Sequence, residues 1–193
     1  WQLDQGFTPR PPGLSCPSSI SIPADKNEAI YNFSANGGAE VRTHQIAMIG
    51  STGVKGGTAY VSTQLTPLEI KDEFVTASIP LAKTTQGYPT EVKVNLTQKV
   101  EFPGTAKVEL LGLPSGAKTV IVEMTKDTKE LTFPITTETG SKTGLHRTLF
   151  CRMTVNFNAT RLTQTFGSRG TLRIDPPPSP PAPKKPMVNT LGK

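Results

Sequence analysis

The feature that most constrains the fold of this chain is a self-similarity at a spacing of about 102 residues. Pro11-Pro12-Gly13-Leu14 lines up with Pro114-Ser115-Gly116-Ala117, and Asp25-Lys26-Asn27-Glu28-Ala29 lines up with Asp127-Thr128-Lys129-Glu130-Leu131. A repeat of this length corresponds to one small domain per copy. The 193 residues therefore hold two small domains in succession rather than one large one.

Strand signals dominate both copies. Val92, Val94 and Leu96 alternate with polar residues, which is the period of a half-buried strand, and no stretch repeats its apolar residues at helical spacing. The Gly-rich stretches 53–57 and 167–170 are predicted to be hairpin turns. We therefore expect an all-β protein made of antiparallel sandwiches. The expected strands are 18–22, 29–34, 44–49, 58–62, 64–70, 74–79, 91–96, 106–111, 119–124, 130–135, 145–155, 161–166 and 171–174.

The two copies differ in length at their N-terminal ends. The sequence predicts an incomplete sandwich over residues 1–71, containing only the C-terminal strands, and a complete sandwich over 72–175. About 30 residues, enough for two or more strands, have no counterpart in the first copy. An open sandwich exposes core and unpaired edges. We expect either the remainder of a longer polypeptide or a partner protein, by strand addition, to pack on residues 1–71.

Charge and hydropathy exclude two classes of partner site. The net charge of +6 is spread over the second copy and the tail, and residues 142–173 carry six basic side chains on predicted strands. Strands scatter such charges over two faces, so we expect a solvated basic edge and no specific nucleic-acid site, with weak attraction to a surface polymer left open. No apolar run reaches the roughly 20 residues of a membrane helix. Residues 176–193 are rich in proline and predict an extended polyproline II tail, either a linker or a docking strap.

The candidate site residues are few, and we predict no catalytic residue and no cofactor. His44 and His146, the only histidines, occupy equivalent repeat positions, which indicates a structural role such as a hydrogen bond to nearby backbone. Cys151 is predicted to be buried as a small hydrophobic residue, whereas Cys16 lies in a loop where an intermolecular disulfide is conceivable. The repeated Asp-x-x-Glu offers weak Ca²⁺ candidates in turns that Asp hydrogen bonds would also explain. These carboxylates are Asp25, Glu28, Asp127 and Glu130.

The motifs of both copies resemble a known class of domain. Pro-Pro-Gly-Leu with the following Ser21–Ala29 stretch, and Leu110–Gly116 with the 125–131 and 144–151 stretches, are similar to bacterial immunoglobulin-like repeats. Such repeats occur in large secreted or envelope proteins of planctomycete-type bacteria, often near pre-peptidase domains or subtilisin-like peptidases. The resemblance implies two tandem immunoglobulin-like sandwiches in a secreted or envelope setting, and it implies no particular activity.

Taken with the residues, this resemblance leads to three expectations of function. The first is a non-catalytic scaffold, spacer or assembly surface. The second is a C-terminal accessory region of a larger hydrolase, most plausibly a peptidase, with any catalytic domain outside this chain. The third is a subunit whose first sandwich is completed by strand addition from a partner.

Overall fold

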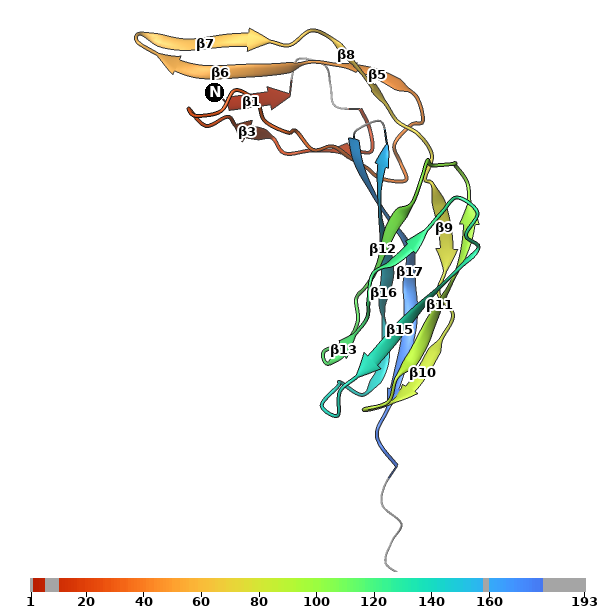
Figure 1. Ribbon diagram of the computed structural model, residues 1–193. Coiled ribbons are helices and arrows are strands. Elements are labelled where there is room, and N and C mark those ends of the chain that lie inside the picture. Colours follow the sequence, from red (N-terminus) through yellow and green to blue (C-terminus); the bar gives the residue numbers. More distant parts are fainter. Residues whose placement is uncertain (1, 6–10, 158–159, 179–193) are drawn as a thin grey trace, which may run out of the picture. The chain divides into compact units, whose positions relative to one another are not determined.

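The computed structural model describes residues 2–5, 11–157 and 160–178 (Figure 1). Seventeen strands and no helix are found in these residues, which confirms the predicted all-β class. No described helix is therefore long and apolar enough to span a membrane. The chain divides into two compact units, Trp1–Asp72 and Glu73–Lys193, called unit 1 and unit 2 below.

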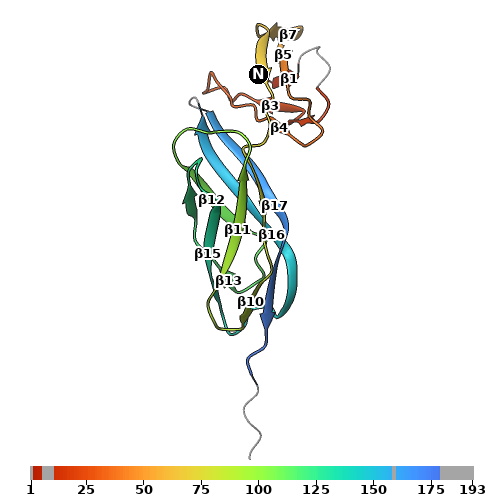
Figure 2. The ribbon, with the colours of Figure 1, turned by 90° about the vertical axis from the view of Figure 1, so that its right-hand side faces the viewer.

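Unit 2 consists of two sheets, which overlap one in front of the other in the view of Figure 2. All of their strand pairs are antiparallel except one: β10 runs parallel to β17, with Ala82 opposite Leu172 and Thr85 opposite Asp175. The sequence analysis missed β10 and expected only antiparallel pairs. In sheet order, the first sheet contains β10 (Ala82–Thr85), β17 (Thr160–Asp175), β16 (Gly144–Phe157), β12 (Ala106–Leu111) and β14 (Val122–Met124), and the second contains β13 (Ala117–Lys118), β15 (Glu130–Thr137), β11 (Thr90–Gln98) and β9 (Val75–Ser78).

The core of unit 2 lies between these sheets and follows the alternation read from the sequence. Val92 and Val94 on β11 are fully buried, as are Phe133 on β15 and Leu149 and Met153 on β16. One cluster of buried side chains joins residues from both sheets. This shared core gives unit 2 the arrangement of a β-sandwich, and burial of its aliphatic and aromatic side chains is the main source of its stability.

One predicted hairpin turn of unit 2 is wrong. Residues 167–170 lie inside β17, which continues to Asp175. They form a bulge, which is seen as a shift of the register with β16 on either side of Leu149. Gly167 and Arg169 both have a φ of 68°. A Cβ at Gly170 would lie 2.7 Å from the Cβ of Ile79, so glycine at this point lets Ile79 pack against the strand. The other predicted turn is confirmed, since Val54 pairs with Gly57 across a two-residue loop.

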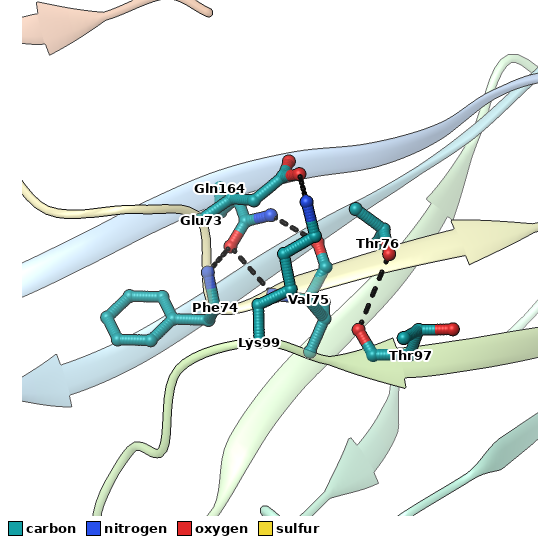
Figure 3. A network of polar contacts seen from close by, with 7 residues as sticks. All are labelled: Glu73, Phe74, Val75, Thr76, Thr97, Lys99 and Gln164. Atoms are coloured by element: carbon teal, nitrogen blue, oxygen red, sulfur yellow. Dashed lines mark hydrogen bonds and ion pairs between the residues drawn. The ribbon is translucent and has the colours of Figure 1, made fainter. Parts of the chain in front are cut away.

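A single side chain joins the two sheets where unit 2 begins. The Gln164 Oε1 on β17 accepts hydrogen bonds from the backbone N–H groups of Phe74 at 2.7 Å and Val75 at 3.4 Å (Figure 3). The Gln164 Nε2 donates to the Val75 carbonyl at 2.6 Å. Beside this bridge, Lys99 Nζ and Glu73 Oε1 form an ion pair at 3.1 Å (Figure 3). Gln164 therefore supplies β9 with hydrogen bonds on the side opposite to β11.

Gln164→Leu is expected to lower the free energy of unfolding of unit 2 by about 2 kcal/mol, because it leaves part-buried backbone groups of β9 without partners. Chemical denaturation followed by circular dichroism measures the change. Thr165→Leu is the matched control: Thr165 is the next residue on β17 and is exposed, so its replacement should change stability by no more than about 0.5 kcal/mol. Equal effects of the two substitutions would refute the role assigned to Gln164.

Unit 1 has smaller sheets and few buried side chains. Leu14 and Ile70 are its only buried hydrophobic residues among those described. Its largest sheet has the order β3-β1-β6-β7, and two further sheets have two strands each, β2-β4 and β5-β8. The strands are β1 (Gln2–Gln5), β2 (Leu14–Ser15), β3 (Ser19–Ser21), β4 (Ser34–Ala35), β5 (Thr43–Ile46), β6 (Met48–Val54), β7 (Gly57–Ser62) and β8 (Thr66–Glu69).

The backbone of unit 1 makes bonds that recur in unit 2 about 103 residues further on. Leu14 N donates to Pro11 O as Ala117 N donates to Pro114 O, and Asn36 N donates to Gly13 O as Glu138 N donates to Gly116 O. Gly13 and Gly116 have φ values of 78° and 80°. The strand order β3-β1-β6-β7 corresponds to β14-β12-β16-β17. The described strands of unit 1 therefore contain no counterparts of β9, β10 and β11.

Candidate interaction surface

A local difference between the units falls on the segment Glu28–Phe33. Its counterpart in unit 2 is residues 130–135, the part of β15 that pairs with β11 from Glu130 opposite Asn95 to Ile135 opposite Thr90. In unit 1 the predicted strand over 29–34 is wrong: residues 28–33 form no strand, and only Ser34–Ala35 does. Those two residues pair with β2, as the end of β15 pairs with β13. The segment Glu28–Phe33 thus has no strand structure along the side on which an equivalent of β11 would pair with it. We call this segment the open edge.

The apolar side chains of the open edge are much less covered than those of β15. Leu131, Phe133 and Ile135 are between 0% and 3% exposed. In the open edge, Tyr31 and Phe33, the equivalents of Phe133 and Ile135, are half-buried, with their ring centroids 5.4 Å apart, and Ile30, the equivalent of Thr132, is 84% exposed. The Tyr31 hydroxyl donates a hydrogen bond to the Pro17 carbonyl. The open edge therefore carries apolar and aromatic side chains near solvent, a composition found at protein interaction surfaces.

The two histidines occupy matching places in their strands. His44 on β5 lies opposite Leu68, and His146 on β16 lies opposite Leu172. The His146 Nε2 is 2.8 Å from the Lys142 carbonyl oxygen, the kind of local backbone contact that the sequence analysis expected. The His44 Nε2 instead accepts a bond from Arg42 Nε at 3.4 Å, and that guanidinium also contacts Glu40 Oε2 at 3.2 Å. The structure thus places both rings on strands, with different local partners.

The repeated carboxylates lie in turns and strand ends. Lys26 N donates to Pro23 O and Thr128 N donates to Thr125 O, closing equivalent turns. In the second turn the Thr128 hydroxyl, rather than the Asp127 carboxylate, accepts a bond from Thr125 N at 3.0 Å. Glu130 forms an ion pair with Lys93 at 3.2 Å. Among the described residues, no three His, Cys, Asp or Glu side chains are grouped as a metal site, so the candidates Asp25, Glu28, Asp127 and Glu130 are not brought together.

The two cysteines, both described, form no disulfide with each other. Cys16 is half-buried in unit 1, and Cys151 is fully buried in β16 between the sheets of unit 2. Burial raises the pKa of the Cys151 thiol to about 12, because the thiolate would lose its hydration. Cys151 is therefore protonated and shielded in the folded protein.

This raised pKa predicts a loss of stability at alkaline pH. Below about pH 9 the Cys151 thiol is protonated in both the folded and the unfolded chain, so it contributes no pH dependence. Between about pH 9 and pH 12 only the unfolded chain releases this proton, so the free energy of unfolding should fall by up to about 1.4 kcal/mol per pH unit. Denaturant titrations across this range should show the steeper slope in the natural chain than in Cys151→Ala. Equal slopes would contradict the prediction.

The basic side chains of residues 142–173 are scattered, and two of them are paired. Arg152 contacts Glu109 Oε2 at 2.6 Å, and Arg173 contacts Asp175 Oδ1 at 2.7 Å. Lys142, Arg147, Arg161 and Arg169 are exposed. The predicted tail is described only at Pro176–Pro178, which follow β17 without regular structure, and its remaining residues, 179–193, lie outside the described residues.

Comparison with known proteins assigns the chain to no group: no protein-family model matches it, and no curated protein matches it significantly. The residues of most interest are therefore those that the structure itself singles out. The sequence analysis predicted a strand over residues 29–34 and did not single out Gln164. The unequal lengths of the two copies were the signal that pointed to the open edge, because they showed which strands had no counterpart.

Proposed function

We propose that the chain is a non-catalytic structural and interaction module, made of tandem immunoglobulin-like repeats of a secreted or envelope-associated protein and acting as a spacer or scaffold. The observation that carries this proposal is the recurrence of the same turn bonds and strand order in both units. The features common to both units, such as the turn glycines Gly13 and Gly116, are ones that define a backbone rather than a reaction site. Proteins that string such units together use them to separate or present other domains.

The topology of unit 2 supports a spacer that carries tension between its ends. Its first strands, β9 and β10, run alongside its last strand: Gln164 contacts Phe74 and Val75, and Leu172 pairs with Ala82. The pairing of β10 with β17 is parallel. Pulling the two ends of unit 2 apart would slide these strands along each other and load their hydrogen bonds together. Pulling apart two residues at the same end of the pair would break the bonds one after another.

Single-molecule force measurements on the full chain test the spacer role. Attachment at Glu73 and Asp175 should give one-step unfolding of unit 2, since these positions load the β9–β10 and β17 strands in shear. Attachment at Thr85 and Asp175, which face each other across the parallel pair, is the control and should give a severalfold lower force. Equal forces, or gradual extension when unit 2 is pulled from Glu73 and Asp175, would contradict the spacer role.

A further inference from the structure

The open edge of unit 1 has a counterpart in unit 2, and the structure shows which strand pairs with that counterpart. We call the strands that fill this place the occupant. In unit 2 the residues equivalent to the open edge are covered by β11, which pairs antiparallel with β15 and inserts Val92 and Val94 into the core. β9 completes this sheet beyond β11, and β10 pairs with the end of β17. Unit 2 therefore shows the occupant in full: three strands joined in the order β9, β10, β11, all within residues 75–98.

Unit 1 departs from this pattern at the surfaces that such an occupant would contact. Residues 28–33 form no strand, whereas Ser34–Ala35, which need only β2, do. β8, the counterpart of the end of β17, lies in a sheet of two strands with β5, and nothing in the described part of the chain takes the place of β10 beside it. Two separate positions, one in each sheet of the repeat, thus lack the strand that unit 2 supplies.

Charge also matches between the open edge and an occupant of this type. In unit 2, Lys93 on β11 forms its ion pair with Glu130 at the start of β15. The residue of the open edge equivalent to Glu130 is Glu28, which is exposed. A cation at the position of Lys93 in the occupant would reproduce this cross-strand pair.

We propose that the open edge Glu28–Phe33 accepts an antiparallel strand of the β11 type, carried by a β9–β10–β11 segment of the same polypeptide that precedes unit 1. The occupant has apolar residues at alternate positions, which cover Tyr31 and Phe33, and a lysine or arginine opposite Ile30, diagonal to Glu28, as Lys93 lies opposite Thr132 and diagonal to Glu130. We place it in the same polypeptide because β11 in unit 2 leads into β12, the counterpart of β1, through a short connection. This inference rests on the proposed role as an interaction module and names the partner of its open surface.

A fusion protein tests this proposal directly. Residues 73–104 of this chain, joined ahead of Trp1 in the full chain, would supply β9, β10 and β11 at the position that the repeat dictates. Hydrogen exchange read by mass spectrometry should then slow by about 100-fold or more at residues 28–33, because these amides would enter a ladder. Exchange at residues 130–135 of unit 2 is the internal reference and should not change.

Two matched variants make the fusion specific. Val92→Asn together with Val94→Asn, in the added copy only, removes the apolar face and should abolish the protection of the open edge. Lys93→Glu in the added copy should reduce the protection about two- to fivefold, the size expected of one cross-strand ion pair, and Glu28→Lys combined with it should restore the protection. Failure of the intact fusion to protect residues 28–33 would overturn the proposal.

A free peptide of residues 73–98, added to the unmodified chain, distinguishes the source of the strand. Protection by the fusion and weak or no protection by the free peptide supports a segment of the same polypeptide. Protection by the free peptide but not by the fusion overturns that source and favours a separate protein. None of these outcomes depends on unit 2 resisting force, so a failure here is distinguishable from a failure of the spacer role.

Discussion

Gly112→Ala should lower the free energy of unfolding of unit 2 by about 4 kcal/mol or prevent its folding. Gly112 follows β12 with a φ of 77°, and a Cβ there would lie 1.8 Å from the Thr148 carbonyl oxygen. The contact is with backbone of β16, so no side-chain rotation relieves it. The Thr148 hydroxyl also donates a 2.6 Å hydrogen bond to the Gly112 carbonyl, which holds the two segments together. Chemical denaturation followed by circular dichroism measures the loss.

Gly104→Ala is the matched control for this substitution. Gly104 has a φ of 71°, almost the same backbone conformation, but nothing lies within 4 Å of the position of its Cβ. Its replacement should therefore cost only the roughly 1 kcal/mol of a left-handed alanine. If the two variants lose the same stability, the close approach of Gly112 to β16 is not what requires glycine there.

Phe133→Ala is expected to lower the free energy of unfolding of unit 2 by about 3 to 5 kcal/mol. Phe133 lies opposite Val92 in the pair of β15 with β11 and is fully buried in the shared core. Truncation of its ring would remove packing in the buried cluster and leave a cavity that the surrounding strands can close only in part. The same denaturation experiment measures the effect, and a loss below about 1 kcal/mol would contradict the core assigned to unit 2.

Ile30→Ala provides the comparison in unit 1. Ile30 lies in the open edge, at the position equivalent to Thr132 rather than to a core residue of β15, and its side chain is 84% exposed. Its replacement should change stability by no more than about 0.5 kcal/mol. A loss of several kcal/mol would mean that Ile30 is buried in the protein in solution, against the exposure that the structure gives it.

The sequence predicted the strands of unit 2 well where one face of a strand is buried. The alternation of Val92, Val94 and Leu96 defined β11, and the expected range 106–111 is that of β12. The sequence could not predict β10 for two reasons. Ala82–Thr85 contains only one small apolar residue, and this edge strand pairs with β17, which is distant in the sequence. Nor could it predict that residues 167–170 form a bulge, since glycines suit a turn and a bulge equally.

The open edge shows a different limit of sequence reasoning. Tyr31 and Phe33 have the alternation of a strand, and the repeat aligns them with Phe133 and Ile135. The pattern records what the segment can form, whereas strand structure also requires a neighbour with which to pair. In unit 2 that neighbour is β11, and among the described residues of unit 1 nothing takes its place. The role of Gln164 was equally hidden, because its partners are backbone groups 89 and 90 residues away in the sequence.

Hydrogen exchange on the unmodified full chain tests the account most directly, by comparing residues 28–33 with residues 130–135 in one experiment. The two segments are equivalent by repeat, and they differ in whether a β11 strand pairs with them. The account predicts that residues 130–135 exchange only through global unfolding of unit 2, while residues 28–33 exchange orders of magnitude faster. Similar protection of both segments would contradict it, because the edge of unit 1 would then already be paired.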